Sequence, residues 1–396
     1  MSRFDTYFLM KTEDIAAYVK EKSDMFSSDA VLDVKEIGDG NLNYVFLVKD
    51  DAGKSLIVKQ AGETLRISDK MRISTERNRI ESEILQLQNK YAPGLVPKIF
   101  SYDTVMCACL MEDLSDHRLM RYALMDFEIF PKFADDITTY MVNTTLSTTD
   151  IVMCAKEKKA LVKNYINPEL CEITEDLVFT EPYNDLNKRN IVFEQNKKFI
   201  EDELYNDKAL HLEIAKIKLA FMTNAQALIH GDLHTGSIFV KQDSTKIFDP
   251  EFAFYGPIGY DVGNIIANLI FAWNRGNAFG KKEFCDLIIK TIIEIIDLFI
   301  EKFIKYFKNN ASDYMLKTED FMRHYLDTIL EDTAAYAGTE LIRRTVGMAQ
   351  VKDITTIENA EKRAEAERIN ILCAKKMIMN RKNFKTGKDF AEAIYV

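Results

Sequence analysis

The stretch 230–256 constrains the fold of this chain more than any other part of its sequence. It contains two short apolar runs on either side of a polar turn, a pattern that predicts a β-hairpin. Asp232 precedes the first run, and Asp249 and Glu251 follow the second. Phosphoryl transfer needs one carboxylate at the acceptor hydroxyl and other groups that hold a metal on the nucleotide phosphates. An acidic surface hairpin is the alternative, but His-Gly-Asp followed at this distance by Asp-x-Glu is rare by chance.

Composition limits the class of protein. The chain has 396 residues, of which 47% are hydrophobic and 29% charged, so a sizeable core can form and disorder is not expected. A net charge of −10 argues against a nucleic-acid or anionic-membrane partner. We find no signal-peptide pattern, and charges interrupt the most apolar segment, 284–307, which favours a buried amphipathic helix. The six scattered cysteines form no CxxC pair, which is typical of a reduced, cytoplasmic protein.

The N-terminal part predicts a glycine-rich loop between two strands. The expected strands are 34–37, 44–48 and 56–60. The loop 38–43, which contains Gly40, joins the first strand to the second, so it cannot be a dinucleotide-binding fingerprint, which needs a helix after the loop. A glycine turn between strands, with a lysine on the next strand, is typical of the loop that covers the nucleotide in kinase-like folds.

Lys59 lies near the end of the third expected strand. It is either an ordinary solvated residue there or a lysine that bridges nucleotide phosphates. In the second case a glutamate on the next helix holds it. We predict that helix at 75–89, where Glu81 or Glu83 could reach Lys59, with Glu81 preferred.

Two further strands, 96–100 and 105–111, lead to Glu112, Asp113 and Leu114. A kinase hinge would present backbone groups to adenine there, although an acidic loop before a helix is the simpler interpretation. Long helical patterns begin near residue 116. We therefore predict an α+β, bilobal protein-kinase-like fold. It has a small antiparallel β lobe with one helix (1–114) and a larger, mostly helical lobe (115–396).

Three segments of the second lobe have distinct patterns. Residues 128–164 look helical, whereas 167–187 contains two prolines and looks irregular. Residues 210–228 predict a helix that leads into the hairpin, with one apolar face. That face is expected to consist of Leu212, Ala215, Leu219 and Met222.

Polar residues around the hairpin have open roles. His230 is expected to be structural, and His234 could face the substrate or simply pack. Asp261 is expected to cap the next helix and to brace the loop around Asp232 through its backbone.

Arg343 and Arg344 lie in a largely apolar helix, where a buried arginine needs a negatively charged partner. The partner could be a carboxylate, Glu340 or Asp332, in a salt bridge. It could instead be the charge on a transferring phosphoryl group.

Several stretches resemble the 5-methylthioribose kinases, relatives of aminoglycoside and choline kinases. They are 36–46, 111–114, 167–171, 228–239, 249–263 and 340–345. The resemblance implies phosphorylation of 5-methylthioribose at its anomeric hydroxyl, with ATP and Mg²⁺, in methionine salvage. It also implies a homodimer.

The resemblance assigns roles residue by residue. Asn43 and Lys59 would contact the nucleotide, and Glu112 to Leu114 would form the hinge. Asp232 would be the base, Asp249 and Glu251 would hold the metal, and Arg343 and Arg344 would contact the substrate. Ser237 stands where kinase-like loops usually place an asparagine, and Glu251 can supply the missing metal ligand.

Two alternatives stay open. One is a kinase of another small alcohol, such as an aminoglycoside, choline or homoserine, although nothing in the sequence marks the aromatic cage that choline needs. The other is an inactive nucleotide-binding module, against which the retention of Lys59, Asp232, Asp249 and Glu251 counts.

Overall fold

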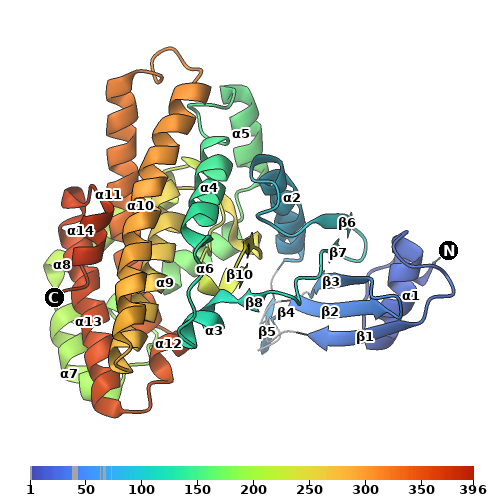
Figure 1. Cartoon of the computed structure of the whole chain (residues 1–396), viewed down its shortest axis with the longest axis horizontal. Coiled ribbons are helices and arrows are strands. Elements are labelled where there is room, and N and C mark those ends of the chain that lie inside the picture. The colour runs from blue at the N-terminus through green and yellow to red at the C-terminus, as the bar shows by residue number, and fades with distance from the viewer. Residues whose placement is uncertain (1, 38–42, 63, 66–67, 73) are drawn as a thin grey trace. The chain divides into compact units, whose positions relative to one another are not determined.

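The computed structural model describes the chain except residues 1, 38–42, 63, 66–67 and 73 (Figure 1). The chain divides into two compact units. The N-terminal unit comprises residues 1–117 with 246–252, and the C-terminal unit comprises 118–245 with 253–396. The division into catalytic lobes at residue 114 remains a prediction. Residues 38–42 of the predicted loop 38–43, with Gly40, lie outside the described residues.

The N-terminal unit is built on an antiparallel sheet in the order β1-β2-β3-β7-β6. The strands are β1 (Leu32–Ile37), β2 (Asn43–Asp50), β3 (Ser55–Ala61), β6 (Ile99–Asp103) and β7 (Ala108–Met111). A ribbon of β4 (Thr64–Leu65) and β5 (Ser68–Arg72) precedes α2 (Glu76–Tyr91), and a short 3-10 turn, η1 (Arg3–Asp5), precedes α1 (Thr12–Lys22). The predicted sheet and the predicted helix at 75–89 are confirmed, whereas the strands expected at 96–100 and 105–111 begin three residues later.

The two faces of this sheet have different roles. On one face Phe46, Leu56 and Val58 pack with α1 in a continuous apolar core. Side chains alternate along a strand, so Lys59 lies on the other face together with Ile57. Val45 of β2 and Cys109 of β7 are the strand partners of Lys59. The sheet register therefore fixes Lys59 on a central strand.

The C-terminal unit is largely helical. Its helices are α3 (Met120–Met125), α4 (Phe133–Leu146), α5 (Ala155–Asn164), α6 (Pro168–Leu177), α7 (Lys197–Ile200), α8 (Lys208–Thr223), α9 (Ile258–Ala278), α10 (Lys282–Asn310), α11 (Glu319–Val346), α12 (Lys352–Thr355), α13 (Ala360–Met379) and α14 (Gly387–Glu392). Short turns are η2 (Glu181–Tyr183), η3 (Glu194–Asn196), η4 (Glu201–Tyr205), η5 (Thr235–Ser237) and η7 (Arg381–Asn383). The α+β prediction is confirmed. No helix in the described part of the chain is long and apolar enough to cross a membrane.

Short strands complete the hairpin region. They are β8 (Arg118–Leu119), β9 (Ala227–Ile229), β10 (Ile238–Lys241), β11 (Ser244–Ile247) and β12 (Phe254–Gly256), with the turn η6 (Pro250–Phe252) between the last two. β11, β10 and β8 are neighbours in one sheet, and β9 pairs with β12 in another. The predicted hairpin is confirmed as β10 and β11.

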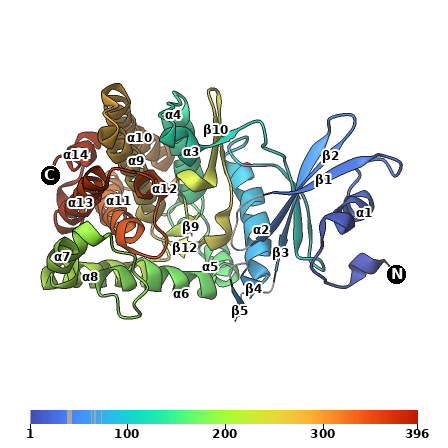
Figure 2. The ribbon, with the colours of Figure 1, turned by 90° about the horizontal axis from the view of Figure 1, so that it is seen from below.

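Helix α9 is buried almost throughout and packs against α10, α11 and α13 (Figure 2). Gly259 and Gly263 allow the backbone of α11 to come close. A Cβ at Gly259 would lie 2.6 Å from the Thr333 nitrogen, and one at Gly263 would lie 2.6 Å from the Thr333 oxygen. This contact fixes α11, which carries the two arginines, against α9.

Two predictions about helices were wrong. Residues 168–177 form helix α6 instead of irregular chain, because Pro168 occupies the first turn, where its fixed φ and missing N–H favour a helix start. On α8 the predicted face is exposed, with Leu212 at 57% and Leu219 at 61%. The buried face is Leu210, Ile214, Ile217 and Phe221. Both stripes are apolar, so helical spacing alone could not choose between them.

Candidate active site

In the N-terminal unit, Lys59 is surrounded by carboxylates. Its Nζ lies 2.6 Å from Oε2 of Glu81 and donates a short hydrogen bond to Oδ1 of Asp249. Glu83, the alternative partner, pairs with Arg79 at 2.8 Å instead. We call Lys59, Glu81, Asp249 and Glu251 the acid–lysine cluster.

Glu251 completes this cluster from the turn η6. Its Oε2 accepts a hydrogen bond from the amide of Asn43 at 2.9 Å and lies 3.8 Å from Nε of Arg77. Glu251 is 5% exposed and Asn43 is 4% exposed. Asn43 and Glu251, 208 residues apart in the chain, are therefore brought together.

The acid–lysine cluster fits a divalent cation. Glu81, Asp249 and Glu251 offer oxygen atoms that all lie within 4.8 Å of one another. Mg²⁺ takes one or two carboxylates together with substrate phosphates. Burial raises the pKa of Glu81 and of Glu251, and nearby Asp249 adds to both shifts. Three carboxylates against Lys59 and Arg77 leave an excess of negative charge that a cation would relieve.

The backbone supports this arrangement. Asp249 has φ +67°, in the left-handed region that non-glycine residues rarely adopt, and such strain gathers at functional sites.

The predicted hinge follows β7. The N–H of Glu112 donates to the Lys98 carbonyl at 2.8 Å, Asp113 accepts from the N–H of Ser115 at 2.9 Å, and Leu114 is 7% exposed.

In the C-terminal unit, Asp261 holds the loop that carries Asp232. Its two oxygens accept hydrogen bonds from the N–H groups of His230 at 2.7 Å and Gly231 at 3.0 Å. Gly231 has φ +82°, which glycine adopts readily. Asp261 lies inside the first turn of α9, which begins at Ile258, so the predicted helix cap was wrong while the predicted brace was confirmed.

His234 contacts Asp232, and its expected contact with the substrate stays a prediction. Its Nδ1 accepts a hydrogen bond from the N–H of Gly236 at 2.9 Å, so in the neutral ring the proton sits on Nε2. That Nε2 lies 3.3 Å from Oδ2 of Asp232. Burial lowers the pKa of His234, which favours this neutral form. Ser237 donates to the carbonyls of Asp232 and His234, each at 2.9 Å, and so ties the loop together.

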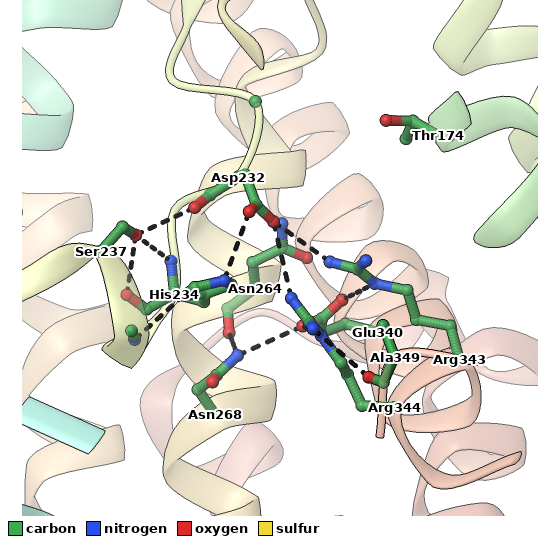
Figure 3. Close-up of polar contacts among 12 residues, drawn as sticks. Thr174, Asp232, His234, Ser237, Asn264, Asn268, Glu340, Arg343, Arg344 and Ala349 are labelled. Atoms are coloured by element: carbon green, nitrogen blue, oxygen red, sulfur yellow. Dashed lines mark hydrogen bonds and ion pairs between the residues drawn. The ribbon is translucent and has the colours of Figure 1, made fainter. Parts of the chain in front are cut away.

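Both arginines of α11 point at Asp232 (Figure 3). From Oδ1 of Asp232, Nη2 of Arg343 lies at 3.3 Å and Nη2 of Arg344 at 3.7 Å. Glu340, rather than Asp332, is the carboxylate that binds both arginines. We call Asp232, Glu340, Arg343 and Arg344 the arginine cluster.

The electrostatics of Asp232 suit an acceptor-binding carboxylate. Burial by itself raises the pKa of Asp232, but His234 and the two arginines lower it well below its ordinary value. The side chain is 28% exposed, so a ligand can reach it. Asp232 is therefore an ionised, accessible hydrogen-bond acceptor with fixed neighbours.

Sequence reasoning missed Asn268 and Arg121. Asn268 of α9 accepts hydrogen bonds from Arg121 and from Oγ1 of Thr235, both at 3.1 Å, and its amide lies 3.4 Å from Glu340. These contacts join α3, α9, α11 and the Asp232 loop. No local sequence pattern marked either residue.

Comparison with known proteins identifies the family. A sequence profile of the phosphotransferase enzyme family matches residues 202–281. Methylthioribose kinases of Bacillus cereus (strain 03BB102) and Bacillus thuringiensis subsp. konkukian (strain 97-27) are each 38% identical over 94% of this chain and 93% of their own length. The fold is similar to that of choline kinase from Cryptosporidium parvum Iowa II. That structure matches with a TM-score of 0.53 and 12% identity, over 93% of this chain and 97% of the other. The chain is a phosphotransferase with the choline kinase-like fold, and it belongs to the methylthioribose kinase family.

Proposed function

We propose that this protein transfers the γ-phosphoryl group of ATP to the anomeric hydroxyl of 5-methylthioribose, giving 5-methylthioribose 1-phosphate in methionine salvage. The observation that carries the proposal is the 38% identity over 94% of the chain with methylthioribose kinases. The two clusters described above support it, because phosphoryl transfer needs groups for the nucleotide phosphates and groups for the acceptor.

The N-terminal unit would bind the nucleotide. Lys59, held by Glu81, would bind the phosphates, and Asn43 would contact the nucleotide. Backbone groups of Glu112, Asp113 and Leu114 would meet adenine, and the loop with Gly40 would cover the phosphates. Asp249 and Glu251 are the residues that would hold Mg²⁺, which when bound neutralises charge on the phosphates.

The C-terminal unit would bind the acceptor. Asp232 would accept a hydrogen bond from the anomeric hydroxyl and take up its proton as the new O–P bond forms. His234 donates toward Asp232 and so keeps one carboxylate oxygen oriented. Arg343 and Arg344 would stabilise charge on the transferred group, which loosens from ADP before bonding to the sugar is complete. A weakly basic aspartate suffices, because most of the proton transfer comes late in such a reaction.

The test is an ADP-release assay over a panel of small alcohols. Methylthioribose should give a much higher kcat/KM than choline, homoserine or an aminoglycoside, and phosphorus NMR should place the phosphate on the anomeric carbon. Faster ADP release with another member of the panel would replace methylthioribose as the substrate. ATP binding without release on any alcohol would favour the inactive module.

Two further properties rest on the sequence, the homodimer on the resemblance and the cytoplasmic location on the scattered cysteines. We propose that the protein is cytoplasmic and that it forms a homodimer. Light scattering on the purified protein would measure its mass in solution, and a mass of a single chain at micromolar concentration would contradict the homodimer.

A further inference from the structure

Glu340 binds both arginines by the same edge of the guanidinium group. Its Oε2 accepts a short hydrogen bond from Nε of Arg343, and its Oε1 accepts one from Nε of Arg344 at 3.1 Å. Because Glu340 binds each arginine through Nε, the terminal amino groups remain available for other acceptors. One amino group of each arginine lies within 3.7 Å of Oδ1 of Asp232 (Figure 3).

Helix geometry explains why this carboxylate matters. Neighbouring residues on an α-helix point about 100° apart, so two adjacent arginines would normally diverge. Glu340 lies three residues before Arg343 and four before Arg344, the two spacings at which side chains on a helix meet. One carboxylate with two oxygens can therefore draw both guanidinium groups to one point.

Glu340 is itself fixed from a second direction. It is 0% exposed, and the amide of Asn268 on α9 lies 3.4 Å from its Oε1. Oδ1 of the same asparagine accepts a hydrogen bond from Thr235 in the Asp232 loop at 3.1 Å. Direct side-chain contacts, without intervening solvent, therefore connect both the arginines and the Asp232 loop to helix α9.

We propose that Glu340 is a positioning residue for phosphoryl transfer, which aims the terminal amino groups of Arg343 and Arg344 at the place where Asp232 meets the acceptor. The inference rests on the proposed function, in which the arginines stabilise the transferred group. Glu340 would act only through the arginines. Its removal should therefore affect the rate of transfer and leave nucleotide binding unchanged.

The first test is Glu340→Gln. The amide has one acceptor oxygen and one donor nitrogen, so it no longer offers a separate oxygen to each Nε atom, and one arginine loses its partner. We expect kcat to fall about 10²-fold, as for other small misplacements of catalytic groups, with KM for ATP within about twofold of the parent. Glu340→Asp keeps the charge and both oxygens but withdraws them by one methylene, so it should fold and lose kcat to an intermediate extent.

Glu367→Gln is the matched control. Glu367 of α13 is 3% exposed and binds Arg363 and Asn196 in place of Arg343 and Arg344. This variant also exchanges a buried, arginine-bound carboxylate for an amide, but it should keep the parent kcat. An equal loss of kcat in the control would reduce Glu340 to a general structural role.

The decisive test repeats Glu340→Gln in an Arg343→Gln/Arg344→Gln background. There it should cost no further activity in single-turnover measurements. It should also raise the melting temperature, because a buried carboxylate without its arginines is costly. In the parent the same change should lower the melting temperature. Equal fold-losses of kcat in both backgrounds would overturn the proposal, as would an unchanged kcat in the parent.

These outcomes are separate from the fate of the proposed function. Methylthioribose turnover by the parent tests the function in the same assay. If another alcohol is the better acceptor, the function is wrong, and the same cycle measured with that acceptor still decides the role of Glu340. The melting temperatures decide whether Glu340 and the arginines act as one unit, whatever the acceptor.

Discussion

The acid–lysine cluster has three carboxylates around Lys59, whereas the arginine cluster has two carboxylates facing two arginines. In the first, burial raises the pKa of Glu81 and Glu251, and Asp249 adds to the shift. In the arginine cluster, burial also raises the pKa of Asp232 and of Glu340, but the nearby cations have the larger combined effect. The pKa of both carboxyl groups is therefore lowered.

This difference separates two ways of building a charged site. The acid–lysine cluster carries more negative charge than its own cations balance, so it gains stability when a divalent cation binds. The arginine cluster is already balanced, so its groups are oriented before a ligand arrives, which favours rate over binding. Substitutions should therefore have opposite effects on stability in the two clusters.

The largest effect should come from Asp232→Asn. The amide keeps the shape of the side chain but removes the proton acceptor and leaves the arginines with one carboxylate fewer. We expect kcat to fall by about 10²–10⁴ with ATP affinity nearly unchanged. Steady-state kinetics and calorimetric titration with ATP measure both. Near-normal turnover would remove Asp232 from its proposed role.

The arginines should be the next most sensitive. Arg343→Ala with Arg344→Ala should cost about 10³-fold in kcat, by comparison with arginine-finger losses. The double variant should also melt at a lower temperature, because it leaves Glu340 buried without a partner. Arg344→Lys keeps the charge but loses the planar fork, so it should cost less than the double change. A double variant that folds and phosphorylates methylthioribose at close to the parent rate would leave the arginines only a structural salt bridge.

Glu251→Gln should have the opposite effect on stability. It removes one of three crowded carboxylates, so the free protein should become more stable, by about 1 kcal/mol. The same change should raise the Mg²⁺ concentration for half-maximal rate by about tenfold, since a hard cation prefers charged oxygen ligands. Melting curves without metal and Mg²⁺ titrations of the rate measure the two effects. A variant that is less stable without metal would contradict the idea of excess negative charge.

The fold could be predicted where the sequence has one clear periodicity. The strands around Lys59 are short, largely apolar runs bounded by turns, and the spacing of α2 allows only one amphipathic helix. α8 shows the limit of this reasoning, because it has two apolar stripes and only the packing of Phe221 against Phe254 and Tyr260 selects one. α6 was missed because a proline favours a helix start as well as a break.

The candidate site was predictable only in part. Acidic and basic residues within short motifs stood out, and the pairing of Lys59 with Glu81 follows from strand and helix order. The network through Asn268 and Arg121 could not be predicted, because it joins residues up to 147 positions apart through helix packing. Local patterns carry no information on such contacts.

Asp332 allows the finest test of the comparison, since it lies on α11 about two turns before Glu340 and lacks the arginine pair. Burial, with Glu331 adding, raises the pKa of Asp332 to about 7, well above that of an unfolded aspartate at about 3.9. A raised pKa means that the folded state keeps a proton that the unfolded chain loses, so stability falls as pH rises from about 4 to about 7. Three pKa units correspond to at most about 4 kcal/mol, but the residue is partly exposed and solvent screening reduces this. We expect Asp332→Asn to be more stable than the parent by about 1 kcal/mol at pH 8 and by much less at pH 4.5, in denaturant titrations at both pH values. Asp327→Asn, at an exposed position of the same helix, is the control and should change stability little at either pH. A stability gain of Asp332→Asn that is equal at both pH values would mean that shape, not charge, decides at this position, and the contrast with Glu340 would then not be electrostatic.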